Sequence, residues 1–218
     1  MKILFKSVKL LVAFTLFALM LISCEKSDNE KDYGFPVIYI PQATITGLDN
    51  SYPIPNGPFG ENSNYNSSYK DGILNIALGV VRAGYLADAM PFSVNVEVSQ
   101  NETDTKVALL EESGISSLKL PTDSYQLPTN VNVEAGTNTG TFYLSVDLSK
   151  LALSKQTLIA NNKWKLLVLG VKLANPSKYE LSDKNTSVIV IIDLNSEYWD
   201  TVDEDAPESE VRTLFPKL

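Results

Sequence analysis

Apolar and polar residues alternate without interruption in the middle of the chain. Phe92, Val94, Val96 and Val98 are separated from one another by single polar residues. Successive side chains of a β-strand point to opposite faces, so this period of two predicts one buried face and one solvent-facing face. We therefore expect a strand over residues 92–98 with the four apolar side chains in the core.

Longer apolar runs predict strands that are buried more completely. Residues 73–81 are apolar on both faces except at Asn75, which indicates a central strand covered on both sides. Residues 164–173 and 188–192 are the two most apolar segments of the second half. A shorter run over residues 36–40 is bounded by proline at both ends, which favours an edge strand or a strand terminus.

Two alternating segments are predicted to pair as a β-hairpin. Residues 131–134 and 141–147 are separated by a short, glycine-containing stretch that suits a hairpin loop. The apolar side chains brought together would be Val131 and Val133 on one strand and Phe142, Leu144 and Val146 on the other.

Residues 104–113 are the best helix candidate. Thr103 or Asp104 is a suitable N-cap, and Gly114 is a suitable stop. Two glutamates near the C-terminal end oppose the helix dipole, so we expect a short helix. The pattern over residues 148–159 leaves the structure of that connector open.

Residues 42–72 form a long region rich in proline, glycine, asparagine and serine. Compact domains rarely contain a structureless loop of this length unless it is functional or disordered. Short strand pairing within residues 44–54 would shorten it. Taken together, short strands without a βαβ rhythm predict an all-β, immunoglobulin-like antiparallel β-sandwich with one short helix, a long N-terminal-half loop and seven or eight strands.

The N-terminus has the form of a lipoprotein signal peptide. Three lysines and no acidic residue precede an apolar run over residues 10–22, which is shorter than the roughly 20 residues of a membrane-spanning helix. The run ends in Leu21-Ile22-Ser23-Cys24, which has the form of a lipobox. We expect cleavage before Cys24 and acylation of that residue, which would anchor the protein stably. The alternative is an uncleaved anchor or a buried core helix.

These patterns divide the chain into four parts. We expect a signal peptide over residues 1–23, a flexible polar tether over 24–34, a β-sandwich domain over 35–195 and an acidic tail over 196–218. The segment after the last strand is rich in aspartate and glutamate, which predicts a solvated tail.

Charge and composition exclude several functions. Removal of residues 1–23, with three lysines and no acids, takes the formal charge from −8 to −11, which disfavours nucleic acid as a partner. The chain has no histidine, and Cys24 is its single cysteine. The most frequent general base and zinc ligand are therefore missing, and no thiol remains for catalysis or a metal. We expect no cofactor and no metal site.

Paired carboxylates are the remaining route to catalysis, because a glycosidase needs two of them beside a cleft. Glu97, Glu134 and Asp193 lie in or beside expected strands, where solvent-facing or strand-end positions explain them more simply. The acids over residues 200–205 lack the spacing and glycine of a calcium loop. We therefore expect that the protein is not an enzyme.

Aromatic residues give the positive functional signal. Tyr65 and Tyr69 flank asparagine and serine on the long loop, and Trp199 follows the last expected strand. Aromatic rings stack on the C–H faces of sugars, while amides and hydroxyls bind sugar hydroxyl groups, so these three residues are candidate glycan contacts. The alternative is that the tyrosines cover the sandwich or lie in a disordered loop. Trp164 is expected in the core.

The order of several motifs resembles a known family. The motifs are residues 37–43, 79–84, 120–128, 131–136 and 188–193. In this order they look like a domain of unknown function that is common in lipoproteins of Bacteroidetes. Some members of that family carry the domain N-terminal to a chitinase-like or endo-N-acetylglucosaminidase-like module.

The resemblance covers roughly residues 36–195 and rests on strand-and-turn patterns. It implies an immunoglobulin-like fold and an outer-membrane, surface-exposed location in the cell envelope. It also implies a context of glycan capture or adhesion. The first hypothesis is therefore a non-catalytic lipoprotein that assists surface glycan binding or uptake, with the membrane (through Cys24) and an oligo- or polysaccharide as partners. The alternative is a structural or adhesive module, fimbria-like or scaffold-like, that binds other envelope proteins.

Overall fold

The computed structural model describes residues 36–45, 49–55, 67–84 and 89–195. The chain divides into two compact units, Met1–Phe35 and Pro36–Leu218, and all the described residues belong to the second. The signal peptide, Cys24, the tether and the acidic tail all lie outside the described residues, so their assignments stay predictions.

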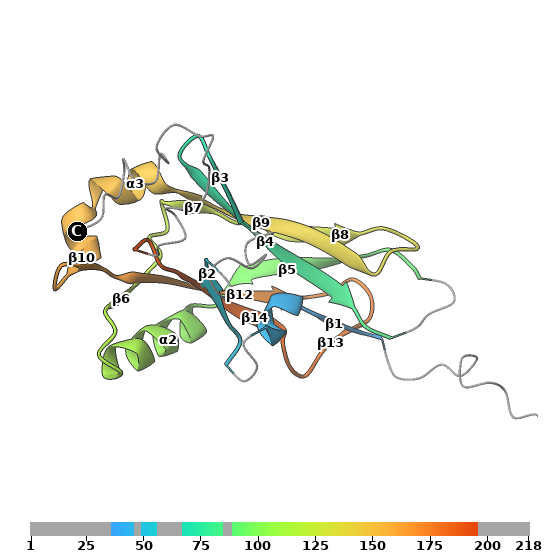
Figure 1. Ribbon diagram of the computed structural model, residues 1–218. Coiled ribbons are helices and arrows are strands. Elements are labelled where there is room, and N and C mark those ends of the chain that lie inside the picture. The colour runs from blue at the N-terminus through green and yellow to red at the C-terminus, as the bar shows by residue number, and fades with distance from the viewer. Residues whose placement is uncertain (1–35, 46–48, 56–66, 85–88, 196–218) are drawn as a thin grey trace, which may run out of the picture. The chain divides into compact units, whose positions relative to one another are not determined.

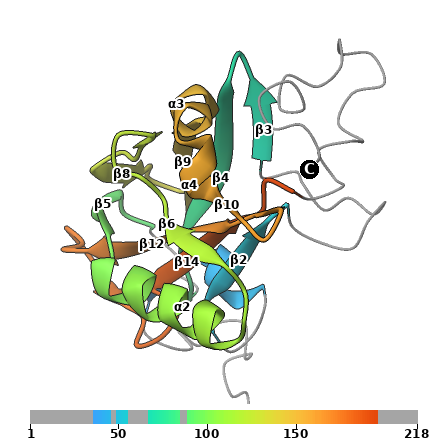
Figure 2. The same cartoon turned by 90° about the vertical axis from the view of Figure 1, so that its left-hand side faces the viewer.

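Two six-stranded sheets, here called sheet A and sheet B, make up most of the described domain (Figures 1 and 2). Sheet A has the order β13 (Glu180–Leu181), β1 (Val37–Tyr39), β4 (Ile73–Arg82), β9 (Thr139–Asp147) and β7 (Tyr125–Gln126), with β3 (Ser67–Lys70) also beside β4. Sheet B has the order β2 (Ser51–Ile54), β14 (Ser187–Ile192), β12 (Leu166–Ala174), β5 (Phe92–Val98) and β8 (Asn130–Val133), with β6 (Ser117–Lys119) also beside β12.

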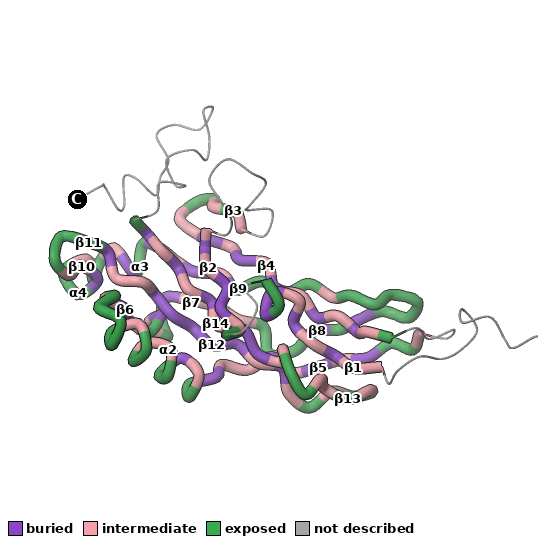
Figure 3. The backbone as a smooth tube through the Cα atoms, turned by 60° about the horizontal axis from the view of Figure 1, so that its bottom comes forward, coloured by how far each residue is buried: buried purple, intermediate pink, exposed green. Residues whose placement is uncertain are grey.

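The sheets enclose one apolar core, and Figure 3 marks the buried residues along the strands. The fold is an all-β sandwich, as the sequence predicts. Most pairings are antiparallel, but β1–β13, β6–β12 and β2–β14 are parallel. Fourteen strands are described where seven or eight were expected, and eight of the fourteen have four or more residues. Of the shorter strands, β1 lies within the strand expected over residues 36–40.

The alternating segment forms β5 as predicted. Phe92, Val94 and Val96 are buried, and Val98 is partly buried against the same core. The long apolar run forms β4, which is central in sheet A. Its coverage differs from the expectation, because buried and half-buried residues alternate along the strand, so only one of its faces lies in the core.

The predicted hairpin of residues 131–134 with 141–147 is wrong. β8 pairs with β5 in sheet B, whereas β9 pairs with β4 and β7 in sheet A. The chain between them therefore crosses from one sheet to the other. The apolar faces of the two strands meet across the core, where the side chains of Val131 and Val133 pack over Gly140. Alternation identifies the buried face of each strand, but it does not distinguish edge pairing from face packing.

The main helix is longer than expected. α2 (Gln100–Glu112) has 13 residues, its N-cap is Ser99, and the chain leaves it through Gly114 at φ +76°. Thr103 is therefore not the cap. Its hydroxyl donates to the Ser99 carbonyl at 2.7 Å and accepts from the Gly170 amide at 2.8 Å, so it joins α2 to β12.

The two uncertain regions contain further short elements. The long N-terminal-half region includes the 3₁₀ helix η2 (Pro41–Thr44), β2 and β3, and residues 46–48 and 56–66 are not described. The connector after β9 forms α3 (Leu148–Leu153) and α4 (Lys155–Leu158), followed by the hairpin of β10 (Ile159–Ala160) and β11 (Lys163–Trp164). The domain therefore has more than the one expected helix. Among its described helices, none is long and apolar enough to cross a membrane.

Arg82, the last residue of β4, is only 2 % exposed. Its guanidinium donates to the Tyr179 hydroxyl at 3.0 Å, to the carbonyls of Thr137 (3.3 Å) and Met90 (3.5 Å), and to the side-chain oxygen of Asn138. It also lies 5.0 Å from the centre of the Tyr179 ring. One side chain thus joins three segments at this end of the sandwich.

Candidate functional site

The four residues proposed from sequence have different positions. Cys24, Tyr65 and Trp199 lie outside the described residues. Tyr69 lies in β3, where it is partly buried, packs against the core and has a buried hydroxyl oxygen. This position matches the alternative in which the tyrosine covers the sandwich, and a glycan contact through Tyr69 stays a prediction. Trp164 is 5 % exposed and belongs to the core, as expected.

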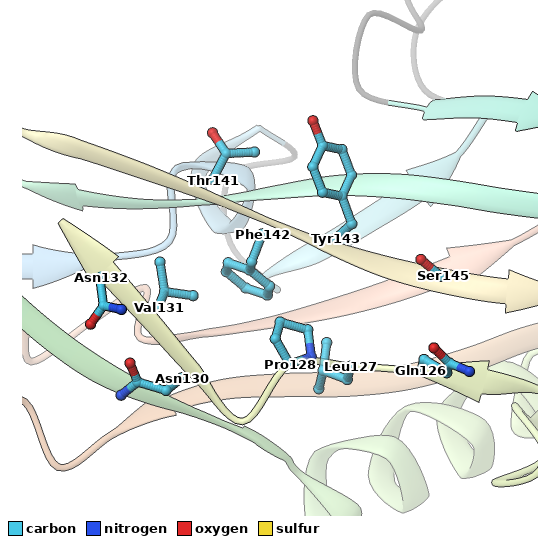
Figure 4. A pocket seen from close by; sticks show the side chains of 10 residues that line it. All are labelled: Gln126, Leu127, Pro128, Asn130, Val131, Asn132, Thr141, Phe142, Tyr143 and Ser145. Carbon is cyan, nitrogen blue, oxygen red and sulfur yellow. The ribbon is translucent and has the colours of Figure 1, made fainter.

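A groove of about 660 Å³ lies along β9, beside the chain that leads from β7 to β8 (Figure 4). It is lined by residues 126–128, 130–132, 141–143 and Ser145. β7 and β8 are the end strands of sheets A and B, so the groove follows the side of the sandwich where the two sheets separate.

The alternation of β9 gives the groove two kinds of surface. Phe142 is buried and points inward toward Pro128 and Val131, while Thr141 and Tyr143 point to the opposite side of the strand (Figure 4). Tyr143 is 53 % exposed. The groove therefore has an apolar floor and an exposed aromatic ring at its margin.

The remaining lining groups are amides and hydroxyls. Gln126, Asn130 and Asn132 are exposed, and the Ser145 hydroxyl is within hydrogen-bond distance of the Asn75 side-chain oxygen, at 2.6 Å. None of the residues that line the groove carries a charge. In a chain that is 20 % charged, this surface is suited to a neutral ligand with many hydroxyl groups.

One edge of β9 is open beside the groove. β7 pairs with only two residues near the C-terminal end of β9, and the described residues contain no other strand on that side. The Asp147 amide donates to the Ser124 carbonyl on this side at 2.7 Å. Because backbone groups alternate between the two edges of a strand, the amides and carbonyls of Thr141 and Tyr143 also face the open edge.

Two ionisable groups lie at the end of β9 near β7. Burial raises the pKa of Tyr125 above its usual value, so this phenol stays neutral at physiological pH. The pKa of Asp147 is lowered, mainly because the Ser149 hydroxyl donates a hydrogen bond to the carboxylate. Neither group is placed to exchange a proton near neutral pH.

The carboxylates weighed from sequence lie apart from the groove. Glu97 pairs across strands with Lys172 at 3.2 Å, and Glu134 is exposed after β8. The Asp193 carboxylate accepts a hydrogen bond from the Asn195 amide at 2.9 Å after β14. Within the described ranges, no three or more acidic or other ligating side chains gather into a possible metal site.

Tyr143 was missed as a candidate. The signal was present in the sequence, because the apolar face assigned to Phe142, Leu144 and Val146 places Tyr143 on the opposite face. The predicted hairpin would have put a strand beside β9, so the open edge and the groove were not foreseen.

Comparisons with known proteins gave structural matches. No protein-family model and no curated protein matches the chain. Among solved structures, a candidate carbohydrate-binding protein from Bacteroides ovatus is similar at 10 % identity and a TM-score of 0.44, over 72 % of this chain and 37 % of that one. A multidomain protein including DUF1735, also from Bacteroides ovatus, is similar at 14 % identity and a TM-score of 0.41, over 67 % and 40 %.

An auxiliary nutrient-binding protein from Bacteroides thetaiotaomicron is similar at 15 % identity and a TM-score of 0.43, over 66 % of this chain and 44 % of that one. The chain thus spans less than half the length of each of these three proteins.

Proposed function

We propose that the protein is a non-catalytic, surface-exposed lipoprotein of the outer membrane that binds carbohydrate through the groove beside β9. The observation that carries this proposal is the exposed ring of Tyr143 in a setting of amides and hydroxyls without charge. Cys24 would hold the protein to the membrane, and the residues after it would join the anchor to the sandwich.

The lining groups suit the chemistry of a sugar. A pyranose ring has an apolar face of C–H groups, which stacks on an aromatic ring, and a rim of hydroxyls that donate and accept hydrogen bonds. Tyr143 supplies the ring, and Gln126, Asn130 and Asn132 supply amides that both donate and accept. Strand residues hold these groups on a rigid scaffold, which limits the entropy lost on binding.

The groove also explains why we propose binding without catalysis. Hydrolysis of a glycosidic bond takes two carboxyl groups on either side of the scissile bond. No aspartate or glutamate lines the groove, and Glu97, Glu134 and Asp193 lie elsewhere.

Replacing Tyr143 with alanine is expected to weaken carbohydrate binding by roughly 5- to 150-fold. This range takes aromatic stacking as about 1–3 kcal/mol, the magnitude for bases on aromatic side chains. Because the side chain is 53 % exposed, the free energy of unfolding should change by under about 1 kcal/mol. Glycan-array screening of the full-length protein in non-ionic detergent identifies a ligand, and calorimetry then compares the variants.

Tyr143→Phe is the matched control, because it keeps the ring and removes only the hydroxyl, and it should retain most of the affinity. Tyr69→Ala tests the earlier candidate, and we expect it to lower stability, because this side chain packs against the core. Full affinity in Tyr143→Ala would contradict the proposed site.

The open edge of β9 favours a second candidate function, a protein contact made by strand addition. Exposed edges are usually protected by lysine, proline or a bulge, and residues 139–144 (Thr-Gly-Thr-Phe-Tyr-Leu) contain neither lysine nor proline. An extended peptide could pair with the backbone of Thr141 and Tyr143. This observation supports the structural or adhesive alternative.

The substitution Thr141→Pro distinguishes the two functions. Proline removes the amide that faces the open edge, so it should block strand addition while leaving the Tyr143 ring in place. Carbohydrate binding that survives Thr141→Pro and is lost in Tyr143→Ala would support the first function. A bound peptide that is lost in Thr141→Pro and retained in Tyr143→Ala would support the second function.

Replacing Cys24 with alanine is expected to abolish acylation, because the lipobox cysteine supplies both the thiol and the new N-terminus that are modified. The variant should appear as uncleaved precursor or as protein that no longer enters the detergent phase on phase separation. Ser23→Ala is the control, since alanine is also small at that position. A Cys24→Ala variant that still enters the detergent phase like the wild type would contradict lipid anchoring.

A further inference from the structure

Positive charge is concentrated in one part of this acidic chain. The sequence has 26 acidic and 18 basic residues, yet residues 148–179 contain six lysines and no aspartate or glutamate. Four of these lysines lie within residues 150–165, which form α3, α4 and the β10–β11 hairpin. We call this part of the domain the basic end.

The lysines of the basic end are available to a ligand to different degrees. Lys150 already lies 3.9 Å from Asp147 and donates to a backbone carbonyl, and Lys155 lies over the Trp164 ring at 5.7 Å. Lys163 is exposed beside the buried Trp164 in β11, and Lys165, which follows this strand, is partly exposed. Neither of them forms an ion pair with any described residue.

A pocket of about 540 Å³ opens beside Lys163. Asn161 and Asn195 bring amide groups to its wall, and Trp164 and Ile115 bring apolar surface, with Ile115 itself 43 % exposed. Asp193 is the one acidic residue in the lining, and its carboxylate accepts the Asn195 amide. The pocket thus combines a cation, one carboxylate that is already hydrogen-bonded, amides and apolar surface.

The basic end lies far from the start of the sandwich. α3, α4 and β10 are at one end of the domain, while β1, the first described strand, is at the other end (Figures 1 and 3).

We propose that the basic end is a second binding site, for a polyanionic polysaccharide, in which an acidic sugar occupies the pocket and its anionic group contacts Lys163. A polysaccharide chain of this kind carries carboxylate or sulfate groups at regular intervals. The anionic group of a neighbouring sugar would therefore reach Lys165. Hydroxyls of the occupying sugar would bond to Asn161 and Asn195. This site is separate from the neutral groove beside β9, and it uses charge where the groove uses stacking.

Charge complementarity supports this occupant. A protein of formal charge −8 repels polyanions in general, so the surface around Lys163 and Lys165 is where one can approach. The amides in the pocket wall suit sugar hydroxyls better than the uniform phosphate rows of a nucleic acid.

Substitution Lys163→Glu is expected to weaken binding of an acidic polysaccharide roughly tenfold or more, because a charge-assisted contact becomes a repulsion. Lys178→Glu makes the same charge change at another exposed lysine, outside the basic end, and should alter affinity by less than about twofold. Polygalacturonate probes carboxylate, chondroitin sulfate probes sulfate, and dextran is the neutral control. Full-length protein in non-ionic detergent is used throughout, at low and high salt.

Binding of either polyanion that weakens with salt and with Lys163→Glu, and survives Tyr143→Ala, would support the proposal. Failure of both polyanions to bind would overturn it, as would binding unchanged in Lys163→Glu. Binding to phosphatidylglycerol vesicles without polysaccharide binding would identify a membrane surface instead. If a polyanion binds only after Asp203, Glu204 and Asp205 are neutralised to their amides, the chain's own acidic tail is the occupant and the proposal fails. None of these results bears on the Tyr143 test.

Discussion

Replacing Arg82 with methionine is expected to lower the free energy of unfolding by about 3 kcal/mol. The guanidinium is almost completely buried and donates to four oxygens on three separate chain segments. Methionine fills a similar volume but leaves the Tyr179 hydroxyl, the Asn138 side chain and two carbonyls without this donor. Each buried polar group left unpaired costs roughly 1–3 kcal/mol, and partial access of water reduces the sum. Urea unfolding monitored by tryptophan fluorescence measures the change.

Two further variants show whether the hydrogen bonds are the cause. Arg82→Lys keeps the charge but not the planar fork of donors, so it should lose part of the stability. Lys172→Met removes a half-exposed partner of Glu97 and should cost less than about 1 kcal/mol. An Arg82→Met variant as stable as the wild type would show that desolvation of the guanidinium cancels its hydrogen bonds.

The main strands of the sandwich were predictable because their apolar residues recur at every second position or form continuous runs. β5 and the apolar strands β4, β12 and β14 were located within a few residues. Their partners were less predictable. β8 follows the alternation expected of a hairpin strand, but its apolar face meets β9 across the core, and its backbone pairs with β5.

Long-range contacts also explain the errors at single residues. The expected strand ends at residue 81, just before Arg82, and the burial of Arg82 depends on Tyr179, a residue 97 positions away in the chain. Thr103 was one of two expected helix caps, but it lies within α2, where its hydroxyl accepts a hydrogen bond from the Gly170 amide. Neither partner can be identified from local pattern, because nothing near Arg82 or Thr103 in sequence indicates which strand will lie beside them.

Tyr143 could not be singled out from the sequence. Candidate sugar-stacking tyrosines among amides and hydroxyls were expected on the long loop at Tyr65 and Tyr69, and these stay predictions. The described residues place another exposed tyrosine, Tyr143, beside amides and hydroxyls at the open edge of β9. Which strand edges are open depends on the complete order of the strands in each sheet. The predicted pairing of β8 with β9 was wrong, so the open edge of β9 was not expected.

The contact between α2 and the outer face of sheet B depends on a residue without a side chain. The Ser99 amide donates to the Gly170 carbonyl at 2.8 Å, and the Gly170 amide donates to the Thr103 hydroxyl at 2.8 Å. A Cβ atom at Gly170 would lie 2.7 Å from the Ser99 carbonyl oxygen and 3.1 Å from the Thr103 hydroxyl oxygen. The first turn of α2 therefore approaches β12 as closely as backbone atoms permit.

We therefore expect Gly170→Ala to lower the free energy of unfolding by about 2–4 kcal/mol, because the added methyl group forces the start of α2 away from β12 and weakens both hydrogen bonds. Urea unfolding gives the magnitude, and amide hydrogen exchange locates it: protection should fall at Ser99 and Gly170 more than in β4. Lys172→Ala, two residues along the same strand face, should cost under about 1 kcal/mol and leave α2 protected. Wild-type stability in Gly170→Ala would mean that α2 can shift on the sheet without loss, and that its close contact with β12 contributes little to the fold.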